Sequence, residues 1–449
     1  MADIKWYWSS ENCPWAVKEP EAVSAAADAQ LCLDGREYQK MYGFGGCFNE
    51  AGWRALQHLS EDDRESLLKE LFAGEGEGAH FNVCRLPIGA NDYSFNWYSL
   101  DEVPGDYALE HFSIERDKLA LIPYIKAALR HTDDMKLFAS PWSPPTWMKD
   151  PPVYNWGKLI WTKENLRAYA DYFVKFLESY QAEGISIDQI HVQNEPVANQ
   201  KFPSCMWTGE ELKVFIRDYL GPRMAESKAA AELWLGTINA PGCDYNRLLF
   251  DKWATEDYDY FANIVLSDPE ALKYITGVSY QWGGKIAIQR TFESWYPRIR
   301  LMQSENECGF GDNTWEYALY VWTMLKHYIG NGAESYLYWN IVLEPSGVST
   351  WGDPQNAMVT IDPKTRTATF NPDYYIMKHF SHAVARDAVR MGCQGSFAGD
   401  SLVFRNPDGS YTLELFNPFR RVFRVQFTLD GKDYMFALEP RSVNSIIIS

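Results

Sequence analysis

The 449-residue sequence lacks the signatures of several large protein classes. It contains no run of 18 apolar residues, so no segment is expected to cross a membrane. Asp and Glu (60) outnumber Lys and Arg (42), and the net charge of −18 argues against nucleic acid or an anionic membrane surface as the main partner. The first residues show no basic segment followed by an apolar one. We therefore expect a cytoplasmic location, or a secreted one if a signal peptide was trimmed from the chain.

Cysteine and histidine are sparse, and neither forms a recognisable pattern. The eight cysteines contain no CxxC pair, and the eight histidines contain no HExxH spacing. These absences argue against a disulfide framework and against a zinc site. We expect unpaired, reduced thiols and no metal or other cofactor, and the sequence leaves the oligomeric state open.

Aromatic residues, in contrast, are abundant. They make up 15% of the chain and include 18 Trp and 27 Tyr. Part of this excess belongs in the core, but Trp also suits carbohydrate binding, because an indole face can stack on the C–H face of a pyranose ring. A sugar is therefore a candidate ligand.

The middle of the chain alternates short apolar runs with amphipathic stretches of helix length. The runs span residues 42–49, 81–89, 136–143, 189–196, 232–240, 276–282, 300–308 and 335–343. The stretches between them include residues 60–72, 114–129, 163–181, 208–224, 268–274 and 314–329. Eight strands that alternate with helices or long loops predict an α/β fold, a (β/α)8 TIM barrel over residues 40–362.

Both ends of the chain have the pattern of antiparallel β-structure. After residue 362, and apart from a helical stretch over residues 373–382, five strands alternate with turns such as Asp430-Gly431. Before residue 40 stand two strand-like segments, which would bury too little surface to be stable alone. We therefore predict a side antiparallel β-sandwich domain that combines residues 1–39 with residues 363–449.

Two of the predicted barrel strands end in a glutamate. Residues 188–196 carry Glu195 just before Pro196, which has no N–H for the sheet and so ends the strand. Residues 299–309 carry Glu305 in the same kind of position. Active sites of such barrels lie at the C-terminal ends of the strands. Two carboxyl groups in that place are what glycoside cleavage needs, one as acid/base and one as nucleophile or second base.

Other strand ends carry polar and aromatic groups that suit the same site. They supply a carboxylate, a guanidinium, an amide and several rings: Glu50, Arg85, Trp142, Asn194, Tyr280, Trp282 and Trp339. Core packing explains any one aromatic residue among them taken alone. Their joint occurrence at successive strand ends indicates a sugar-binding cleft.

These segments resemble glycoside hydrolase family 30, the group that contains lysosomal glucocerebrosidase. The resemblance covers essentially the whole barrel and includes residues 43–46, 85–89, 139–148, 172–177, 194–196, 216–222, 265–277 and 339–340. It implies a barrel with a side β-domain built from both chain ends, and hydrolysis with retention of the anomeric configuration.

The resemblance also implies roles for individual residues. Glu195 matches the family's acid/base and Glu305 its nucleophile, while Asn194 matches the asparagine that hydrogen-bonds the sugar 2-hydroxyl. Glu50 stands where the family often has an aspartate that contacts the distal hydroxyls. Three further residues match the lining of the −1 pocket: Arg85, Trp142 and Trp339.

The chain departs from the family pattern in two places. Tyr280-Gln281-Trp282 replaces a more usual His-x-Tyr sequence, which puts Trp282 where a tyrosine hydroxyl commonly contacts the nucleophile. Glu307 lies two residues after Glu305 and would share its face of a regular strand. Glu305 is preferred because it follows Ser304 as in the family motif, and Glu307 is the alternative nucleophile.

The sequence therefore predicts a retaining β-glycoside hydrolase that cleaves β-glucosides or short β-glucans through a glycosyl-enzyme. Within the same class, β-xylosidase, β-fucosidase and β-1,6-glucanase activities stay open. A non-catalytic sugar-binding barrel is an alternative of another class, and the presence of both carboxyl groups argues against it. A metal-dependent barrel hydrolase is a third, and it lacks clustered ligands.

Overall fold

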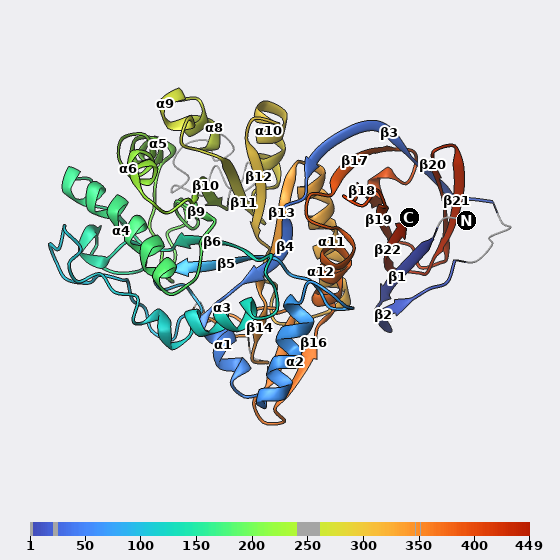
Figure 1. Ribbon diagram of the computed structural model, residues 1–449, viewed down its shortest axis with the longest axis horizontal. Coiled ribbons are helices and arrows are strands. Elements are labelled where there is room, and N and C mark those ends of the chain that lie inside the picture. Colours follow the sequence, from blue (N-terminus) through green and yellow to red (C-terminus); the bar gives the residue numbers. More distant parts are fainter. Residues whose placement is uncertain (1–2, 21–25, 240–260, 346, 351) are drawn as a thin grey trace.

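The computed structural model describes residues 3–20, 26–239, 261–345, 347–350 and 352–449. Two parts lie side by side along the long axis of the molecule (Figure 1). One is a barrel surrounded by helices. The other is a β-domain, at the right of the view, that holds both ends of the chain.

Eight parallel strands form the closed barrel that the sequence predicts. In chain order they are β4 (Gly43–Cys47), β5 (Val83–Ile88), β6 (Lys136–Pro141), β9 (Gln189–His191), β10 (Glu232–Ile238), β11 (Gly277–Gln281), β12 (Arg300–Glu305) and β13 (Ala333–Asn340). Each strand overlaps one of the eight apolar runs. Pairing of β13 with β4 closes the ring.

The barrel interior changes from apolar to polar along the strands. Five strands contribute one buried layer: Val83, Phe138, Trp234, Met302 and Leu337. Because successive side chains alternate between the two faces of a strand, residues two positions further along point into the same interior. Arg85 and Ser140 therefore stand above Val83 and Phe138, closer to the C-terminal ends, and begin the polar layer.

Helices cover the outside of the barrel (Figure 1). Those that the sequence predicts include α2 (Glu61–Phe72), α4 (Lys163–Ala182), α9 (Pro269–Leu272), α11 (Trp315–Gly330) and α12 (Pro372–Ala383). Ser60 caps α2, since its Oγ accepts from the Asp63 N–H at 3.1 Å. Asp268 caps α9, and Pro269 takes the first helical position.

Two predicted helices are interrupted. Residues 114–129 form a short 3₁₀ turn and then α3 (Leu121–Leu129), and the backbone of Ala120 between them is not helical, with φ at −146°. Buried Asp117 in the turn accepts hydroxyl hydrogen bonds from Tyr98 and Tyr180. Residues 208–224 divide into α5 (Gly209–Phe215), a π-helical segment (Ile216–Leu220) and α6 (Gly221–Glu226). Pro222 has no N–H to donate, which breaks the regular hydrogen-bond ladder at this point.

Three α-helices in the described part of the chain were not predicted: α1 (Glu50–Leu56), α8 (Phe261–Leu266) and α10 (Lys285–Trp295). The first two are too short to show a helical period. The third follows Gly284, and no side chain caps its first turn. Sequence signals that mark a helix start are therefore absent from α10.

The side domain is one nine-stranded sheet from both ends of the chain. Its strands are β1 (Ile4–Ser10), β2 (Cys13–Val17), β3 (Ala29–Lys40), β17 (Val389–Gln394), β18 (Ser401–Arg405), β19 (Tyr411–Asn417), β20 (Phe423–Leu429), β21 (Lys432–Leu438) and β22 (Ser442–Ile448). Their order is β2-β1-β22-β19-β18-β17-β3-β20-β21. The predicted partnership of the two chain ends is thus present, although β2 and β17 were not predicted. The pairing of β3 with β20 is parallel and the others are antiparallel.

This sheet folds over on itself. The ring of Trp6 on β1 lies 5.5 Å from that of Phe436 on β21, although seven places separate these strands in the sheet order. Both rings belong to one buried cluster with Leu413, Val425 and Ile446. The two halves of the sheet therefore enclose a common core, as the layers of a sandwich do.

The exact division between barrel and side domain stays a prediction. A small sheet of β14 (Val342–Leu343), β15 (Val359–Asp362) and β16 (Thr367–Phe370) continues across residue 362. The helix α12 contacts β4 and α11 of the barrel on one side and β22 on the other. A two-stranded ribbon of β7 (Lys149–Asp150) and β8 (Lys158–Leu159) lies in the loop after β6. Within the described residues, no helix is long and apolar enough to span a membrane.

Candidate active site

A cavity of about 380 Å³ opens at the C-terminal ends of the barrel strands. The predicted site residues that line it are Trp142, Asn194, Glu195, Trp282, Glu305 and Trp339. Side chains from five strand ends or the loops after them thus meet at one place. The two glutamates on which the sequence prediction depends share a single cavity.

Glu305 faces this cavity because β12 contains one extra residue. Met302 fills the barrel interior, so regular alternation would turn Ser304 inward and Glu305 outward. The pairing of β12 with β11 shifts by one residue just before Glu305, which pairs with Gln281. The resulting bulge turns the Glu305 carboxylate into the barrel mouth.

The Glu305 carboxylate receives two hydrogen bonds at the floor of the cavity. Its Oε2 accepts from the Arg85 guanidinium Nη1 and from Gln281 Nε2, the latter at 2.9 Å. Burial raises the pKa of Glu305, the positive charge of Arg85 opposes this, and the charges of Glu195 and Asp92 add to the rise.

Glu195 follows β9 in a left-handed backbone conformation, with φ at 44°, which is uncommon for a residue with a side chain. Its N–H donates to Thr237 O at 2.9 Å, and its carbonyl accepts from the Ala198 N–H at 2.8 Å. These bonds hold the strained conformation. The Glu195 Oε1 accepts from Asn239 Nδ2 at 3.0 Å. Burial raises the pKa of Glu195, while the Asn239 hydrogen bond and the Arg85 charge lower it.

The two carboxyl groups therefore differ in the charge of their hydrogen-bond donors. Glu305 is in direct contact with a guanidinium, which stabilises its carboxylate form. Glu195 receives an uncharged amide, and it lies in the same low-dielectric cavity as the negative charge on Glu305. The arrangement favours an ionised Glu305 beside a protonated Glu195.

Asn194 is oriented by three donors beneath the cavity. Its Oδ1 accepts from Arg85 Nη2 at 2.6 Å, from Gln281 Nε2 at 2.9 Å and from Thr237 Oγ1 at 3.0 Å. Because all three donors converge on the oxygen, the amide nitrogen is the atom left for a ligand. Ser140 Oγ accepts from Arg85 at 2.9 Å and completes the support of the guanidinium.

Two indoles cover Arg85. The rings of Trp142 and Trp339 stack with centroids 5.6 Å apart, and the guanidinium carbon lies 4.4 Å and 5.5 Å from their centroids. The Trp339 side chain also hydrogen-bonds Asp92, and burial raises the pKa of Asp92 to about 7. The closed end of the cavity thus combines aromatic faces with a carboxyl group, a pattern suited to a polyhydroxylated ring.

Three predicted binding residues do not line the cavity: Arg85, which lies beneath it, and Glu50 and Tyr280, for which a direct sugar contact stays a prediction. Glu50 is the first residue of α1, where its carboxylate pairs with Arg116 at 2.8 Å and accepts from the Phe95 N–H at 2.7 Å. It anchors the loop after β5. Tyr280 alternates outward from β11, and its hydroxyl lies 2.6 Å from Thr291 Oγ1 on α10.

The alternative nucleophile, Glu307, lines the cavity but is held differently. Its Oε2 accepts from the Tyr320 hydroxyl at 2.7 Å, on α11. Arg85 contacts Glu305 instead. The geometry therefore favours Glu305 over Glu307.

The family model for the glycosyl hydrolase family 30 TIM-barrel domain matches residues 41–384. The chain belongs to glycoside hydrolase family 30. This confirms the predicted family and enzyme class, and a carbohydrate is the substrate. The reading as a non-catalytic sugar-binding barrel is therefore set aside.

Curated relatives of this family 30 enzyme carry two kinds of name. Lysosomal acid glucosylceramidase of Mus musculus is 29% identical over 89% of this chain and 79% of that protein. Putative glucosylceramidase 1 of Caenorhabditis elegans is 29% identical over 92% of this chain and 82% of that protein. Endo-1,6-beta-D-glucanase of Neurospora crassa is 26% identical over 96% of this chain and 89% of that protein.

Solved structures match the whole chain. SrfJ from Salmonella typhimurium superposes with a TM-score of 0.85 at 25% identity and covers 100% of this chain and 99% of that one. An endo-beta1,6-glucanase structure superposes with a TM-score of 0.86 at 24% identity, with 99% of each chain covered. These matches confirm the barrel with its side β-domain.

Among the residues at this candidate site that were not predicted are Asp92, Asn239 and Gln281. Gln281 lies within the motif that the sequence singled out, and strand alternation assigns it, rather than Tyr280, to the interior. Asn239 follows β10 directly, so its place agrees with the rule that site residues lie at the C-terminal ends of barrel strands. Asp92 lies in the loop after β5, where no periodic pattern operates.

Among the described residues, no group of three or more His, Cys, Asp or Glu could hold a metal ion. The seven cysteines in this part of the chain are free. Cys243 lies outside the described residues. The predicted absence of disulfides and metals stays a prediction for the whole chain.

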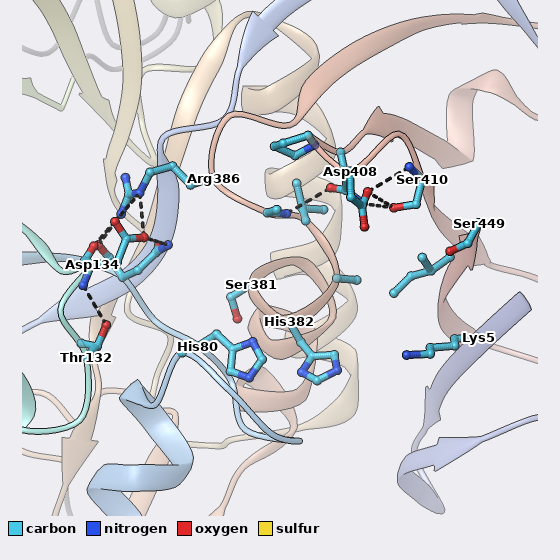
Figure 2. Close-up of a pocket in the computed structure, with 18 of the residues that line it drawn as sticks. Lys5, His80, Thr132, Asp134, Ser381, His382, Arg386, Asp408, Ser410 and Ser449 are labelled. Carbon is cyan, nitrogen blue, oxygen red and sulfur yellow. Dashed lines mark hydrogen bonds and ion pairs between the residues drawn. The ribbon is translucent and has the colours of Figure 1, made fainter. Parts of the chain in front are cut away.

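A second cavity, of about 560 Å³, lies at the opposite end of the barrel, where the side domain joins it (Figure 2). Its two aspartates are engaged locally. Asp134 pairs with Arg386 at 2.8 Å, and Asp408 accepts from the Ser410 hydroxyl at 2.7 Å. Figure 2 shows these two pairs on separate sides of the space. The cavity therefore does not offer the paired carboxyl groups that family 30 chemistry requires.

Proposed function

We propose that this family 30 enzyme is a retaining β-glycosidase that acts on β-glucosides or short β-glucans, with Glu195 as acid/base and Glu305 as nucleophile. One observation carries the proposal. A single cavity holds Glu305 against the Arg85 guanidinium and Glu195 against the neutral Asn239 amide. A retaining mechanism requires this difference, because the nucleophile must be ionised while the acid is protonated.

The reaction proceeds in two displacements. In the first, Glu195 gives its proton to the glycosidic oxygen as the bond from that oxygen to the anomeric carbon breaks. A Glu305 oxygen bonds to the anomeric carbon, and the leaving group departs as an alcohol. In the second, a water gives a proton to the Glu195 carboxylate and attacks the same carbon, which breaks the ester to Glu305. One water is consumed, and the sugar keeps its β configuration.

The change of role at Glu195 follows from the charge of its neighbour. Once Glu305 is esterified it carries no charge, so the negative potential at Glu195 is reduced. The pKa of Glu195 then falls, and the carboxylate it has become accepts a proton from water. The proximity of the two groups thus serves both displacements.

The remaining residues of the closed end position the sugar. The Asn194 amide nitrogen donates to the 2-hydroxyl, and Asp92 accepts from the distal hydroxyls, the role that the sequence prediction gave to Glu50. Trp142 and Trp339 form the walls. Trp282 follows Gln281 on the open side, and its backbone N–H donates to Glu305 O at 3.0 Å.

The names of the relatives support glucose in the closed end. One group of relatives is named for glucosylceramide and the other for a β-1,6-linked glucan. β-1,6-Glucanase activity is the alternative that a relative's name favours, and β-xylosidase and β-fucosidase activities stay open within the family.

Hydrolysis of 4-nitrophenyl β-D-glucoside, β-D-xyloside and β-D-fucoside, together with a β-1,6-linked gluco-oligosaccharide, tests this proposal. We expect the glucoside to have the highest kcat/KM, and proton NMR to detect the β-anomer as the first product. Initial release of the α-anomer would refute retention. Loss of activity in a chelator would support the metal-dependent alternative instead.

A further inference from the structure

Phe310 stands at the open side of the catalytic cavity. It lines the same cavity as Glu195 and Glu305, yet its side chain is 84% exposed, the largest exposure of any large hydrophobic residue in the described part of the chain. A phenylalanine so exposed beside a functional cleft is a feature that marks binding surfaces. Nothing in the two displacements above uses it.

The backbone on both sides of Phe310 is fixed by close packing. Gly309 has φ at 60°, and a side chain there would meet Asn356 at 2.7 Å. Gly311 has φ at 77°, and a side chain there would meet Pro354 at 2.7 Å. The Asn356 N–H also donates to Cys308 O at 2.6 Å. The loop is therefore seated on residues 354–356 and presents Phe310 outward in a defined place.

Two more aromatic side chains surround the same opening. Phe202 lines the cavity from the segment after β9, and an ion pair of 4.0 Å between Lys201 and Asp353 connects this segment to the one on which the Phe310 loop is seated. Trp282 lines the cavity from the end of β11. Rings from three different loops thus converge around the mouth.

The two ends of the cavity differ in chemistry. The closed end presents buried polar groups, Asp92 at 5% and Asn194 at 3% exposed, which suit sugar hydroxyls. Phe310 is exposed, and Phe202 and Trp282 are half-buried, so these lining residues lie closer to solvent. A substrate with its sugar in the closed end must direct its leaving group toward these rings.

We propose that Phe310 is a specificity-determining residue that binds the leaving group through an apolar face. Substrates whose leaving group carries an alkyl or aryl surface beside the glycosidic oxygen gain affinity and reactivity from Phe310. Substrates with a small leaving group, such as methanol, gain neither affinity nor reactivity from Phe310. This inference rests on the proposed function, in that the closed end takes the sugar.

A matched pair of substrates tests the inference by kinetics. The octyl and methyl β-glycosides of the sugar selected by the aryl panel are compared in the wild type and in Phe310→Ala, with octyl glycoside kept below its critical micelle concentration. In Phe310→Ala we expect kcat/KM for the octyl substrate to fall roughly tenfold, because the octyl chain loses an apolar side chain against which it is partly buried. The kcat/KM for the methyl substrate should change less than about twofold. Phe310→Leu should retain most of the octyl preference.

Phe419→Ala is the matched control, because Phe419 is also an exposed phenylalanine, at 45%, but lies in the side domain. Phe419→Ala should change kcat/KM for neither substrate. Equal losses for both substrates in Phe310→Ala, or no loss for either, would overturn the inference. The high exposure of Phe310 means that its replacement leaves the core intact.

A binding measurement separates this inference from the proposed function. Octyl and methyl β-thioglucosides, which resist hydrolysis, are titrated calorimetrically into the same variants. The wild type should bind the octyl compound about tenfold more tightly than the methyl compound, and Phe310→Ala should remove most of this ratio. If the protein shows this difference in binding but no turnover of any substrate, the proposed function is refuted and the inference about Phe310 is not. If Phe310→Ala leaves the ratio of the octyl and methyl affinities unchanged, the inference is refuted, whether or not the enzyme turns over substrate.

Discussion

Arg85 and Glu305 are in direct contact beneath a stacked pair of indoles, and Arg85 is wholly buried there. A buried ion pair of this kind contributes less to stability than its geometry suggests, but removal of one partner leaves an uncompensated charge at a cost of about 3–5 kcal/mol. Substitution of Arg85 would therefore confuse folding with catalysis. A substitution of Glu305 removes the other partner of the same pair, so the thermal stability of that variant must be measured beside its activity.

Glu305→Gln should abolish turnover of an aryl β-glucoside, because an amide cannot form the glycosyl ester. We expect kcat to fall by at least roughly 10³-fold, the scale of losses for a removed nucleophile. Glu307→Gln is the matched control and should keep most activity, since Tyr320 holds Glu307. The reverse ranking of the two variants would assign the nucleophile to Glu307.

Glu195→Ala should spare substrates whose leaving group needs no proton. With a dinitrophenyl β-glucoside the first displacement stays fast, and the glycosyl-enzyme should accumulate as a burst, whereas an alkyl glucoside should lose about 10²–10⁴-fold in rate. Azide should rescue the variant and give the β-glycosyl azide, because the small anion enters the space of the carboxylate. An α-azide product would contradict the mechanism.

Retention also predicts that the carboxyl groups of Glu195 and Glu305 lie about 5–5.5 Å apart.

Gln281→Met should move the acid limb of the kcat/KM profile to higher pH. The Gln281 amide donates to the Glu305 carboxylate at 2.9 Å and so stabilises its charged form. Burial already raises the pKa of Glu305, and loss of this donor raises it further. As the pH is lowered, the variant should therefore lose activity at a pH about 1 unit higher than the wild type does. A pH–rate series on wild type and variant measures the shift. An unchanged acid limb would show that Glu305 does not control it.

His379 should make the protein less stable in mild acid. Its ring lies buried on α12 between Ser9 Oγ at 2.8 Å and Ser445 Oγ at 2.7 Å, and burial lowers its pKa to about 3. The unfolded chain, with a histidine pKa near 6.5, binds the proton first, so stability falls as the pH drops below about 6.5. Between pH 7 and pH 5 the loss from this group is about 2 kcal/mol. Urea unfolding of wild type and His379→Gln at both pH values tests this, and equal pH dependence would contradict it.

The sequence predicts the barrel well because its evidence is local and repeated. Each strand is a short apolar run, and Glu195 and Glu305 lie at the ends of such runs. The differences between the predicted and the observed arrangement have physical causes. Tyr280 was assigned to the site and Gln281 was not, because a strand end alone does not say which face is inward. The bulge that turns Glu305 inward depends on pairing with β11, which no single-strand pattern records.

Other parts of the site depend on contacts between loops. Asp92 reaches the cavity from a loop whose position is fixed partly by Glu50, through the Phe95 N–H. The sequence places Glu50 near the right strand end but not the direction in which α1 carries it. In the same way, β17 was missed because its residues are recognisable as a strand only beside β3 and β18.

The pairing of the two chain ends has a consequence for synthesis. Trp6 on β1 donates its indole N–H to Asn444 Oδ1 on β22, which comes 438 residues later. At about 5–20 residues per second, a ribosome needs roughly 20–90 s between making the two partners. Throughout that time the first strands have too few neighbours to form a stable sheet. The side domain therefore cannot complete its sheet until β22 has been made, and a ribosome that stalls before β22 leaves the Trp6 indole without its Asn444 acceptor.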